Sequence, residues 1–373
     1  MIKEYVFEEC LQKIKTPKKL PKKKYLEKGH YPVVAQEEAL INGYTDDKNL
    51  LYKVEDTLII FGDHTRHLKL VDFDFVLGAD GVKILKPIED IDTKYFYYYL
   101  RAQMPHSLGY ARHYKLLKKL SFLIPPLPVQ KQIVEKLDAA FADIDKAISA
   151  TEKNIENAEA LFDKSVSKIF VENTFEYETK RLSDISEYFN GLTYSPKDVS
   201  PEGVIVLRSS NIQDNKMDYK DLVRVNKKFK DKLYVLDSDI LICSRNGSKR
   251  LIGKSSIIGK YHEKMTFGTF MMIVRSEYNE YLKWFFISSL FKKQISRGEN
   301  TMINQITRYM LDEVIVPFPA DNEKKEISLN LNSIYESTSK LIDIYRKKLE
   351  HLDSLKTSFL NQAFSGELTK DAA

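Results

Sequence analysis

The chain has 373 residues, of which 43% are hydrophobic and 30% are charged, and its formal net charge at pH 7 is +5. This length suits two or three domains, and the hydrophobic content excludes a fully disordered chain. The longest apolar stretch, around Trp284–Phe291, is far shorter than the roughly 18 residues of a membrane-spanning helix, and the N-terminus lacks the apolar core of a secretion signal.

The cysteines and the placement of charge narrow the class further. Cys10 and Cys243 stand far apart without metal-type spacing, which disfavours a disulfide scaffold or a zinc cluster and predicts a cytoplasmic protein. The positive balance lies in two segments: residues 1–128 carry 21 basic and 17 acidic residues, and residues 171–322 carry 23 and 20. This excess is weak evidence for a polyanionic partner.

Along the chain, the first predicted feature is a lysine-rich stretch without acids between Glu9 and Glu27. It is either a solvated loop or a phosphate-binding segment. An apolar strand at Asp56–Ile60 then runs into a polar, basic loop at Gly62–Arg66, and an aromatic helix follows at Lys94–Leu100. The tyrosines of that helix offer base stacking, but their helical spacing and apolar neighbours favour core packing.

The same order recurs in the second half of the chain. A strand at Asp239–Cys243 runs into the loop Arg245–Lys249, and an aromatic helix follows at Tyr281–Phe286. This loop belongs to a second acid-free window that contains arginine and asparagine. Both side chains can bind base edges with two hydrogen bonds, whereas lysine mostly neutralises phosphate.

A proline cluster closes each copy, at Ile124–Pro128 and at Val316–Pro319, and a long helical pattern follows each cluster. Apolar or small residues recur at alternating spacings of three and four over more than four heptads, with one clear failure at Lys356. In the first helix they are Leu137, Phe141, Ile144, Ile148, Thr151, Ile155, Ala158, Phe162, Ser165 and Ile169. In the second helix, 194 residues later, they are Leu331, Tyr335, Thr338, Ile342, Tyr345, Leu349, Leu352, Lys356, Phe359 and Ala363.

The order module, helix, module, helix predicts an α+β fold in which two similar α/β domains are separated by a long antiparallel two-helix coiled coil. The internal repeat predicts a pseudo-two-fold axis across this helix pair. Two separate helical hairpins, or helices packed on their own modules, remain the alternative. Two similar but non-identical basic modules at a fixed separation suit a split, asymmetric site on double-stranded DNA.

The chain resembles the specificity subunits of type I restriction–modification systems. The resemblance covers nearly the whole chain and is carried by Ile124–Val134 and its degenerate copy at Val316–Ile327, by Gly203–Ile212, by Asp239–Gly247 and by Phe359–Leu368. It implies target-recognition domains at residues 1–124 and 173–316 and spacer helices at residues 125–172 and 317–373. The implied partners are two DNA methyltransferase subunits and the restriction–translocase subunits. S-adenosylmethionine, ATP and magnesium are expected on those partners, and no cofactor is expected in this chain.

Motifs for catalysis are missing from the sequence. It has no Asn-Pro-Pro-aromatic or Asp-Pro-Pro-Tyr element for adenine methylation, and no glycine-rich loop of the cofactor-binding or P-loop kind. Asp80-Gly-Val-Lys83 only distantly resembles a nuclease motif, and the His64/His67 pair lacks further metal ligands nearby. We therefore expect a non-catalytic recognition subunit without a metal site.

The candidate DNA contacts are basic or amide side chains in the predicted loops. In the first domain they are Lys22, Lys23, His64, Arg66, His67, Arg112 and His113. In the second domain they are Arg208, Ser209, Asn211, Arg245, Asn246, Lys249, Arg250, Asn304, Gln305 and Arg308. Two alternatives stay open: a specificity subunit of a restriction class that cuts on both sides of its site, and a coiled-coil scaffold that binds only proteins. A stand-alone enzyme is disfavoured by the missing cofactor motif.

Overall fold

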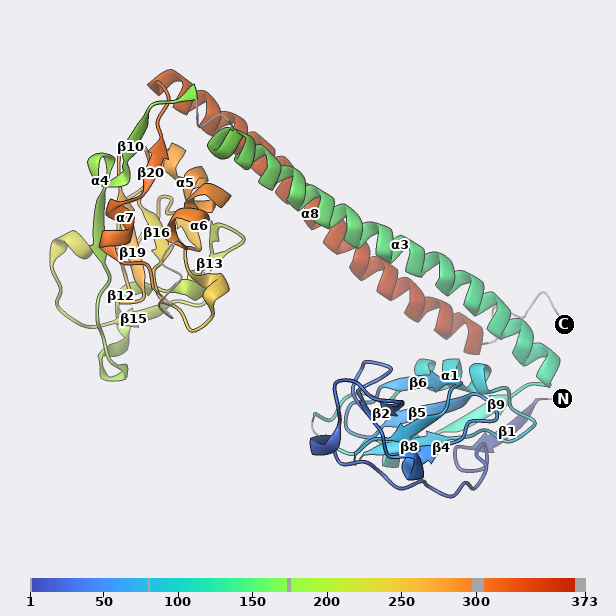
Figure 1. The fold of residues 1–373 in the computed structure, drawn as a ribbon. Coiled ribbons are helices and arrows are strands. Elements are labelled where there is room, and N and C mark those ends of the chain that lie inside the picture. The colour runs from blue at the N-terminus through green and yellow to red at the C-terminus, as the bar shows by residue number, and fades with distance from the viewer. Residues whose placement is uncertain (1, 80, 110, 173–175, 297–304, 366–373) are drawn as a thin grey trace. The chain divides into compact units, whose positions relative to one another are not determined.

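A computed structural model describes residues 2–79, 81–109, 111–172, 176–296 and 305–365. The chain forms two compact units (Figure 1). Unit 1 comprises Met1–Glu152 and Arg346–Ala373, and unit 2 comprises Lys153–Tyr345. The predicted fold class with two α/β units is confirmed, whereas the predicted domain bounds stay a prediction. Each unit includes part of both long helices. No helix in the described ranges is long and apolar enough to cross a membrane.

Unit 1 contains two main sheets, with strand orders β3-β2-β7-β4 and β6-β5-β8, and a separate pair β1-β9. Its strands are β1 (Lys3–Val6), β2 (Tyr31–Val34), β3 (Gly43–Thr45), β4 (Leu51–Tyr52), β5 (Leu58–Gly62), β6 (Leu68–Val71), β7 (Phe75–Leu77), β8 (Val82–Leu85) and β9 (Ser121–Ile124). Its α-helices are α1 (Thr93–Ala102), α2 (Tyr114–Leu117), the first part of α3 (Leu127–Ser167) and the last part of α8 (Asp321–Phe364). All five residues of β5 are buried, as expected for a central strand with a continuous apolar sequence.

Unit 2 contains sheets with strand orders β11-β19-β16-β17 and β15-β12-β18, and the pairs β13-β14 and β10-β20. Its strands are β10 (Thr179–Arg181), β11 (Glu187–Asn190), β12 (Val199–Leu207), β13 (Ile212–Gln213), β14 (Lys216–Met217), β15 (Val223–Val225), β16 (Ile240–Cys243), β17 (Ser255–Ile257), β18 (Met265–Phe267), β19 (Met271–Arg275) and β20 (Ile315–Pro317). Its α-helices are the last part of α3, α4 (Leu182–Ile185), α5 (Asn279–Ile287), α6 (Ser289–Ile295), α7 (Arg308–Asp312) and the first part of α8.

The two units share one topology. In unit 1 β2 pairs parallel to β7 and antiparallel to β3, and in unit 2 β12 pairs parallel to β18 and antiparallel to β15. Likewise β5 lies between β6 and β8, and β16 lies between β17 and β19, in antiparallel pairs throughout. The strands that precede each long helix, β9 and β20, pair antiparallel with β1 and β10. The internal repeat predicted from the sequence is therefore a repeat of the fold.

Corresponding aromatic contacts join each module to the long helices. In unit 1, Tyr99 of α1 stacks on Phe364 of α8 at 4.4 Å between ring centroids, and Tyr98 meets Phe141 of α3 at 5.4 Å. In unit 2 the roles of the two long helices are exchanged. Phe285 of α5 meets Phe170 of the α3 extension at 5.8 Å, and Trp284 meets Tyr335 of α8 at 5.5 Å. Both aromatic helices therefore pack in the core, as their spacing predicted.

The start of each long helix is held by a buried polar side chain at the same repeat position. Gln130 is fully buried; its amide donates to the carbonyls of Asp90 and Pro125 and accepts from the backbone N–H of Asp92. Lys324, which is 5% exposed, donates to the carbonyl of Pro319, and its ammonium lies 3.6 Å from the ring centroid of Phe318. Both side chains satisfy backbone carbonyls that proline-rich turns leave without helical partners.

Candidate nucleic-acid interface

Four chain segments of unit 2 meet where strands β12, β16 and β18 end. The Nδ2 of Asn246 donates to the Oγ of Ser209 at 3.4 Å, which links the loops after β16 and β12. The backbone N–H of Arg245 donates to the carbonyl of Phe270 at 3.1 Å, and Arg245 also forms a β-bridge with Gln305. We call residues 208–210, 244–246, 268–270 and 305–308 edge 2.

Edge 2 combines a cavity with an exposed aromatic ring. Residues from three strand ends line the cavity: Tyr194, Arg208, Ser209, Ser210, Gly268, Thr269, Phe270 and Met271. Phe270 is 54% exposed, and the guanidinium of Arg245 lies over its ring at 5.5 Å. An exposed large aromatic beside an arginine provides a surface on which a base can stack and a cation for phosphate or a base edge.

The charges of edge 2 favour a polyanion. Arg245 and Arg308 of edge 2 are exposed, and so are Lys249 and Arg250, which follow edge 2 in the connection after β16. Arg208 is partly exposed and pairs with Asp221 at 2.8 Å, which holds its guanidinium in one place. The neighbouring Cys243 is fully buried, and burial raises the pKa of its thiol, so the thiol stays protonated at neutral pH and is not a nucleophile.

Corresponding segments of unit 1 also meet at one edge. The turn Gly62–His67 joins β5 to β6, and the side chain of Gln36, after β2, accepts a hydrogen bond from the backbone N–H of His64 at 3.4 Å. The hydroxyl of Thr65 donates to the carbonyl of Gln36. The backbone N–H of Asp63 donates to the carbonyl of Gly81 at 2.6 Å. We call residues 36–37, 62–67 and 78–81, without the undescribed residue 80, edge 1.

The predicted contacts of unit 1 lie at or near this edge with different exposure. Arg66 has a left-handed backbone (φ 63°), and its guanidinium donates to the carbonyl of Pro105 at 3.0 Å. Lys22 and Lys23 lie in an exposed 3₁₀ turn, and Lys22 pairs with Glu37 of edge 1 at 2.8 Å. His64 and His67 are partly buried, and Arg112 is exposed. No group of three or more potential metal ligands is found among the described residues.

A buried lysine supports edge 1 from within. Lys69 is 6% exposed, and its ammonium donates to the carbonyl of Ala35 at 2.8 Å, to Oδ1 of Asn42 at 2.9 Å and to the carbonyl of Ala39. Burial lowers its pKa to about 8. Lys69 therefore holds the connection between β2 and β3 in place and does not present its charge to a ligand.

Two predicted DNA contacts are corrected because their side chains are buried. His113 is 0% exposed; Leu108 N–H donates to its Nε2 at 3.0 Å, and its Nδ1 lies 3.0 Å from the carbonyl of Asp63. The backbone N–H of His113 also donates to the carbonyl of Asp63, and in unit 2 the backbone N–H of Ile306 donates to the carbonyl of Ser244 in the same way. His113 therefore occupies the position that the apolar Ile306 has in unit 2. Asn211 is 1% exposed and is described below as a structural residue.

Other predicted residues have different outcomes. Gln305, in the β-bridge with Arg245, and Arg308, the first residue of α7, are both exposed. Asn304 and Asp80 lie outside the described residues. Sequence reasoning missed Phe270 and Tyr194, which line the cavity of edge 2. Phe270 follows Gly268 by two residues and Tyr194 follows Gly191 by three, and each glycine stands directly after a strand. A glycine shortly before an aromatic residue at a strand end was therefore the sequence signal that could have pointed to them.

The fold and these edges define a class: proteins with two α/β modules of one topology, each of which presents basic and amide side chains at one edge. The family model for the type I restriction modification DNA specificity domain matches residues 8–157 and 175–351. The chain belongs to this family.

Curated relatives and solved structures agree with this assignment. The chain is 26% identical to the EcoKI specificity subunit of Escherichia coli over 202 residues, which are 51% of this chain and 42% of that protein. It is 21% identical to the MjaVIII specificity subunit of Methanocaldococcus jannaschii, over 91% of this chain and 86% of that protein.

A chain from a structural study of complex assembly and conformational transition in the type I R-M system matches over 98% of both chains, with a TM-score of 0.75 and 15% identity. The HsdS subunit from Thermoanaerobacter tengcongensis matches over 98% of this chain and 97% of its own, with a TM-score of 0.51 and 16% identity. At this identity the likeness shows the fold.

Proposed function

We propose that this chain is the sequence-specific DNA-binding subunit of a type I restriction–modification complex, and that edges 1 and 2 each bind one half of a split, asymmetric DNA site. One observation carries the proposal: corresponding strand ends build an edge in each unit, yet the side chains at the two edges differ. Arg245 and Phe270 of edge 2 correspond to His64 and Gly81 of edge 1 by strand register. Arg245 and His64 lie two residues after the last paired residues of β16 and β5, and Phe270 and Gly81 lie directly before the partners of those residues in β19 and β8. A repeated frame with different donors suits two unrelated half-sequences.

The long helices supply the separation between the two half-sites in this proposal. In unit 1, Lys356 of α8 forms an ion pair with Asp145 of α3. In unit 2, the ring of Tyr335 of α8 lies 5.3 Å from that of Phe162 of α3. The partner position moves back along α8 as α3 advances, which supports one antiparallel coiled coil. The 41 residues of α3 would span roughly 60 Å at 1.5 Å per residue.

The catalytic steps are proposed to reside on partner chains. Edges 1 and 2 offer donors for phosphates and base edges. Two methyltransferase subunits would supply S-adenosylmethionine chemistry, and restriction–translocase subunits would supply the ATP- and magnesium-dependent steps. A base must leave the helical stack before it is methylated, and the methyltransferase would perform that step while this chain fixes its position on DNA.

The test is to map methylated bases in the source genome with and without this gene. The expected result is one interrupted motif with two unrelated halves, methylated only when the gene is present. A second measurement is salt-dependent DNA binding by the chain assembled with its methyltransferase partner, since phosphate contacts release counterions. A protein-binding scaffold would leave the methylation pattern unchanged and would show no salt-sensitive DNA binding.

A further inference from the structure

A short hairpin of unit 2 has no counterpart at the equivalent place in unit 1. The connection from β12 to β15 includes the hairpin β13–β14, whereas the equivalent connection from β2 to β3, residues 35–42, forms no strand. The shared topology of the two units does not require this hairpin. Its contacts therefore indicate what it adds to unit 2.

The hairpin has a well-defined geometry. Its two loop residues, Asp214 and Asn215, have φ angles of 48° and 59°, in the left-handed region that a two-residue hairpin turn needs. Asp and Asn adopt this region more readily than other non-glycine residues. At the base of the hairpin, Ile212 is fully buried in the core of unit 2. The hairpin is thus anchored at its base and projects a tight tip.

The tip contacts helix α8 within unit 2. The hydroxyl of Tyr335 donates to the carbonyl of Asp214, and the ammonium of Lys216 donates to the Oγ of Ser339 at 2.9 Å. The Lys216 ammonium also lies 5.0 Å from the centre of the Tyr335 ring. That ring is fixed by Trp284 and Phe162, at 5.5 and 5.3 Å between centroids. Burial raises the pKa of Tyr335 to about 12, so its hydroxyl keeps its proton.

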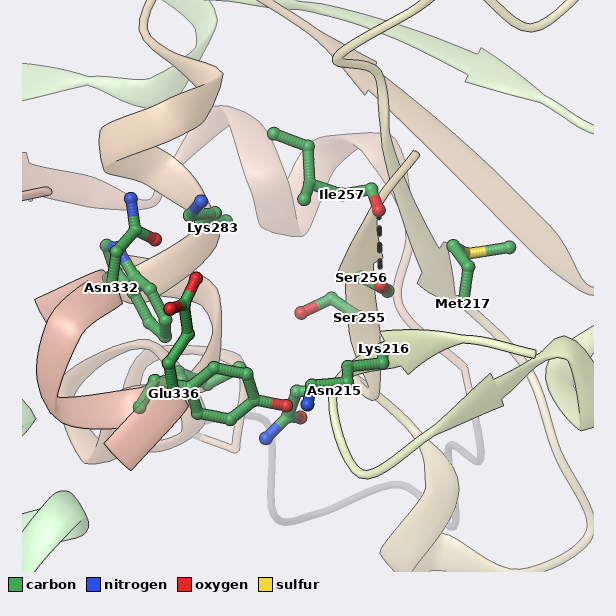
Figure 2. A pocket seen from close by; sticks show the side chains of 12 residues that line it. Asn215, Lys216, Met217, Ser255, Ser256, Ile257, Lys283, Asn332 and Glu336 are labelled. Atoms are coloured by element: carbon green, nitrogen blue, oxygen red, sulfur yellow. Dashed lines mark hydrogen bonds between the residues drawn. The ribbon is translucent and has the colours of Figure 1, made fainter. Parts of the chain in front are cut away.

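A cavity lies beside this contact, between the hairpin and α8. Figure 2 shows Lys216 and Met217 of the hairpin on one side and Asn332 and Glu336 of α8 on the other. Residues 255–257 of β17 and Lys283 of α5 also line the cavity. The hairpin therefore bears on α8 through its tip and does not pack along the helix.

The base of the hairpin contacts edge 2. Oδ1 of the buried Asn211 accepts from the backbone N–H of Arg208 at 2.9 Å, and its Nδ2 donates to the carbonyls of Asp218 and Asp221 at 3.0 and 2.9 Å. The carboxylate of Asp221 pairs with the guanidinium of Arg208. A short series of direct contacts thus links α8, the hairpin tip, the hairpin base and the Arg208 loop.

We propose that hairpin β13–β14 is a positioning element that ties edge 2 to helix α8, so that the helix determines where Arg208 and Ser209 meet DNA. Lys216 and Tyr335 are positioning residues, and Asn211 passes their restraint to Arg208. The inference rests on the proposed function. It assigns part of the tolerance for the spacing between half-sites to a tip contact in unit 2 that unit 1 lacks.

The experiment uses the complex of the full chain with its methyltransferase partner. Methylation rates are measured on duplexes that carry the mapped site with its natural spacer or with one base pair removed or added. One base pair moves a half-site by about 3.4 Å and turns it by about 35°. In the double variant Lys216→Ala/Tyr335→Phe, the preference for the natural spacer should fall by about threefold or more. Base preference within each half-site and the thermal unfolding midpoint should stay unchanged.

Two variants serve as controls. Lys216→Arg keeps a cation at the tip and should keep the wild-type spacer preference. Lys220→Ala removes an exposed lysine from the same connection and should also keep it. An unchanged spacer preference in the double variant, or an equal loss of rate on all three duplexes, would overturn the inference while leaving the proposed function intact. Failure of the wild-type complex to methylate a specific sequence would overturn both.

Discussion

Arg245 gives the sharpest test of edge 2. Its side chain is exposed, and no ion pair of Arg245 is found among the described residues, so its charge is available to a ligand. Its β-bridge with Gln305 and the N–H that it donates to Phe270 involve the backbone and survive Arg245→Ala, which removes only the side-chain contact with the exposed Phe270 ring. The substitution should therefore leave the fold intact and act on DNA binding alone.

The size of the effect depends on what the guanidinium contacts. An arginine that binds guanine with two hydrogen bonds contributes about 1–3 kcal/mol of discrimination. Arg245→Ala should then weaken binding of the mapped site about 5- to 150-fold and relax the preference at one base position only. The assay is fluorescence anisotropy of the assembled complex on a panel of duplexes that differ at single positions, at two salt concentrations.

Arg181→Ala is the matched control, because Arg181 is an exposed arginine of β10 that pairs with Glu313 and lies outside edge 2. This control should keep wild-type affinity within about twofold, as expected for a weak surface ion pair. A uniform loss on all duplexes with a shallower salt dependence would assign Arg245 to a phosphate. Wild-type affinity for every duplex would refute the assignment of Arg245 to the DNA surface.

Three further predictions concern the two domains, the aromatic packing between the modules and the long helices, and the buried lysine. Exchange of residues 1–124 for those of another family member should change one half of the methylated motif, and a change in the other half would refute two independent edges. Phe170→Ala removes a fully buried ring and should lower the free energy of unfolding in urea by about 3–5 kcal/mol. The exposed control Leu161→Ala should change the free energy of unfolding by no more than about 0.5 kcal/mol. Equal losses in the two variants would contradict a stabilising role of the buried Phe170 ring. Because burial lowers the pKa of Lys69 to about 8, the unfolded chain binds more protons between about pH 8 and pH 10, and stability rises with pH there. Lys69→Met should abolish this rise, and parallel pH profiles for the two proteins would rule it out.

The repeat was predictable from the sequence because it resides in apolar spacing. Leu137 and Leu331 occupy the same heptad position 194 residues apart, and both are fully buried. Lys356 interrupts the apolar pattern, and the sequence did not reveal that it forms an ion pair with Asp145 of the other helix. That pair depends on how two distant segments lie together. Periodicity therefore predicts a helix face but not which polar group the face accepts.

The candidate DNA contacts were harder to predict, because a polar side chain in a loop can hydrogen-bond either to DNA or to the protein backbone. Asn211 and Asn246 look alike in sequence, yet Asn211 is buried against Arg208 and Asp218, whereas Asn246 stays partly exposed at edge 2. Asp214 and Asn215 are residue types that favour a hairpin turn, but the contact of Asp214 with Tyr335 joins positions 121 residues apart. Such long-range contacts cannot be derived from local spacing.

The apolar core that joins the modules to the long helices is separate from edges 1 and 2, and this separation bears on how such a protein can change its target. The packing of Tyr99 on Phe364 and of Phe285 on Phe170 uses apolar burial, which does not depend on the side chains at the strand ends. If edges 1 and 2 bind DNA as proposed, substitutions at Arg245 or His64 should therefore alter recognition at little cost to folding. The contact of the hairpin residue Lys216 with Ser339 is the exception, because it connects the hairpin at the base of edge 2 with helix α8. Variants of edge 2 that shift Arg208 should accordingly alter spacer preference as well as base preference, whereas variants of edge 1 should alter base preference alone.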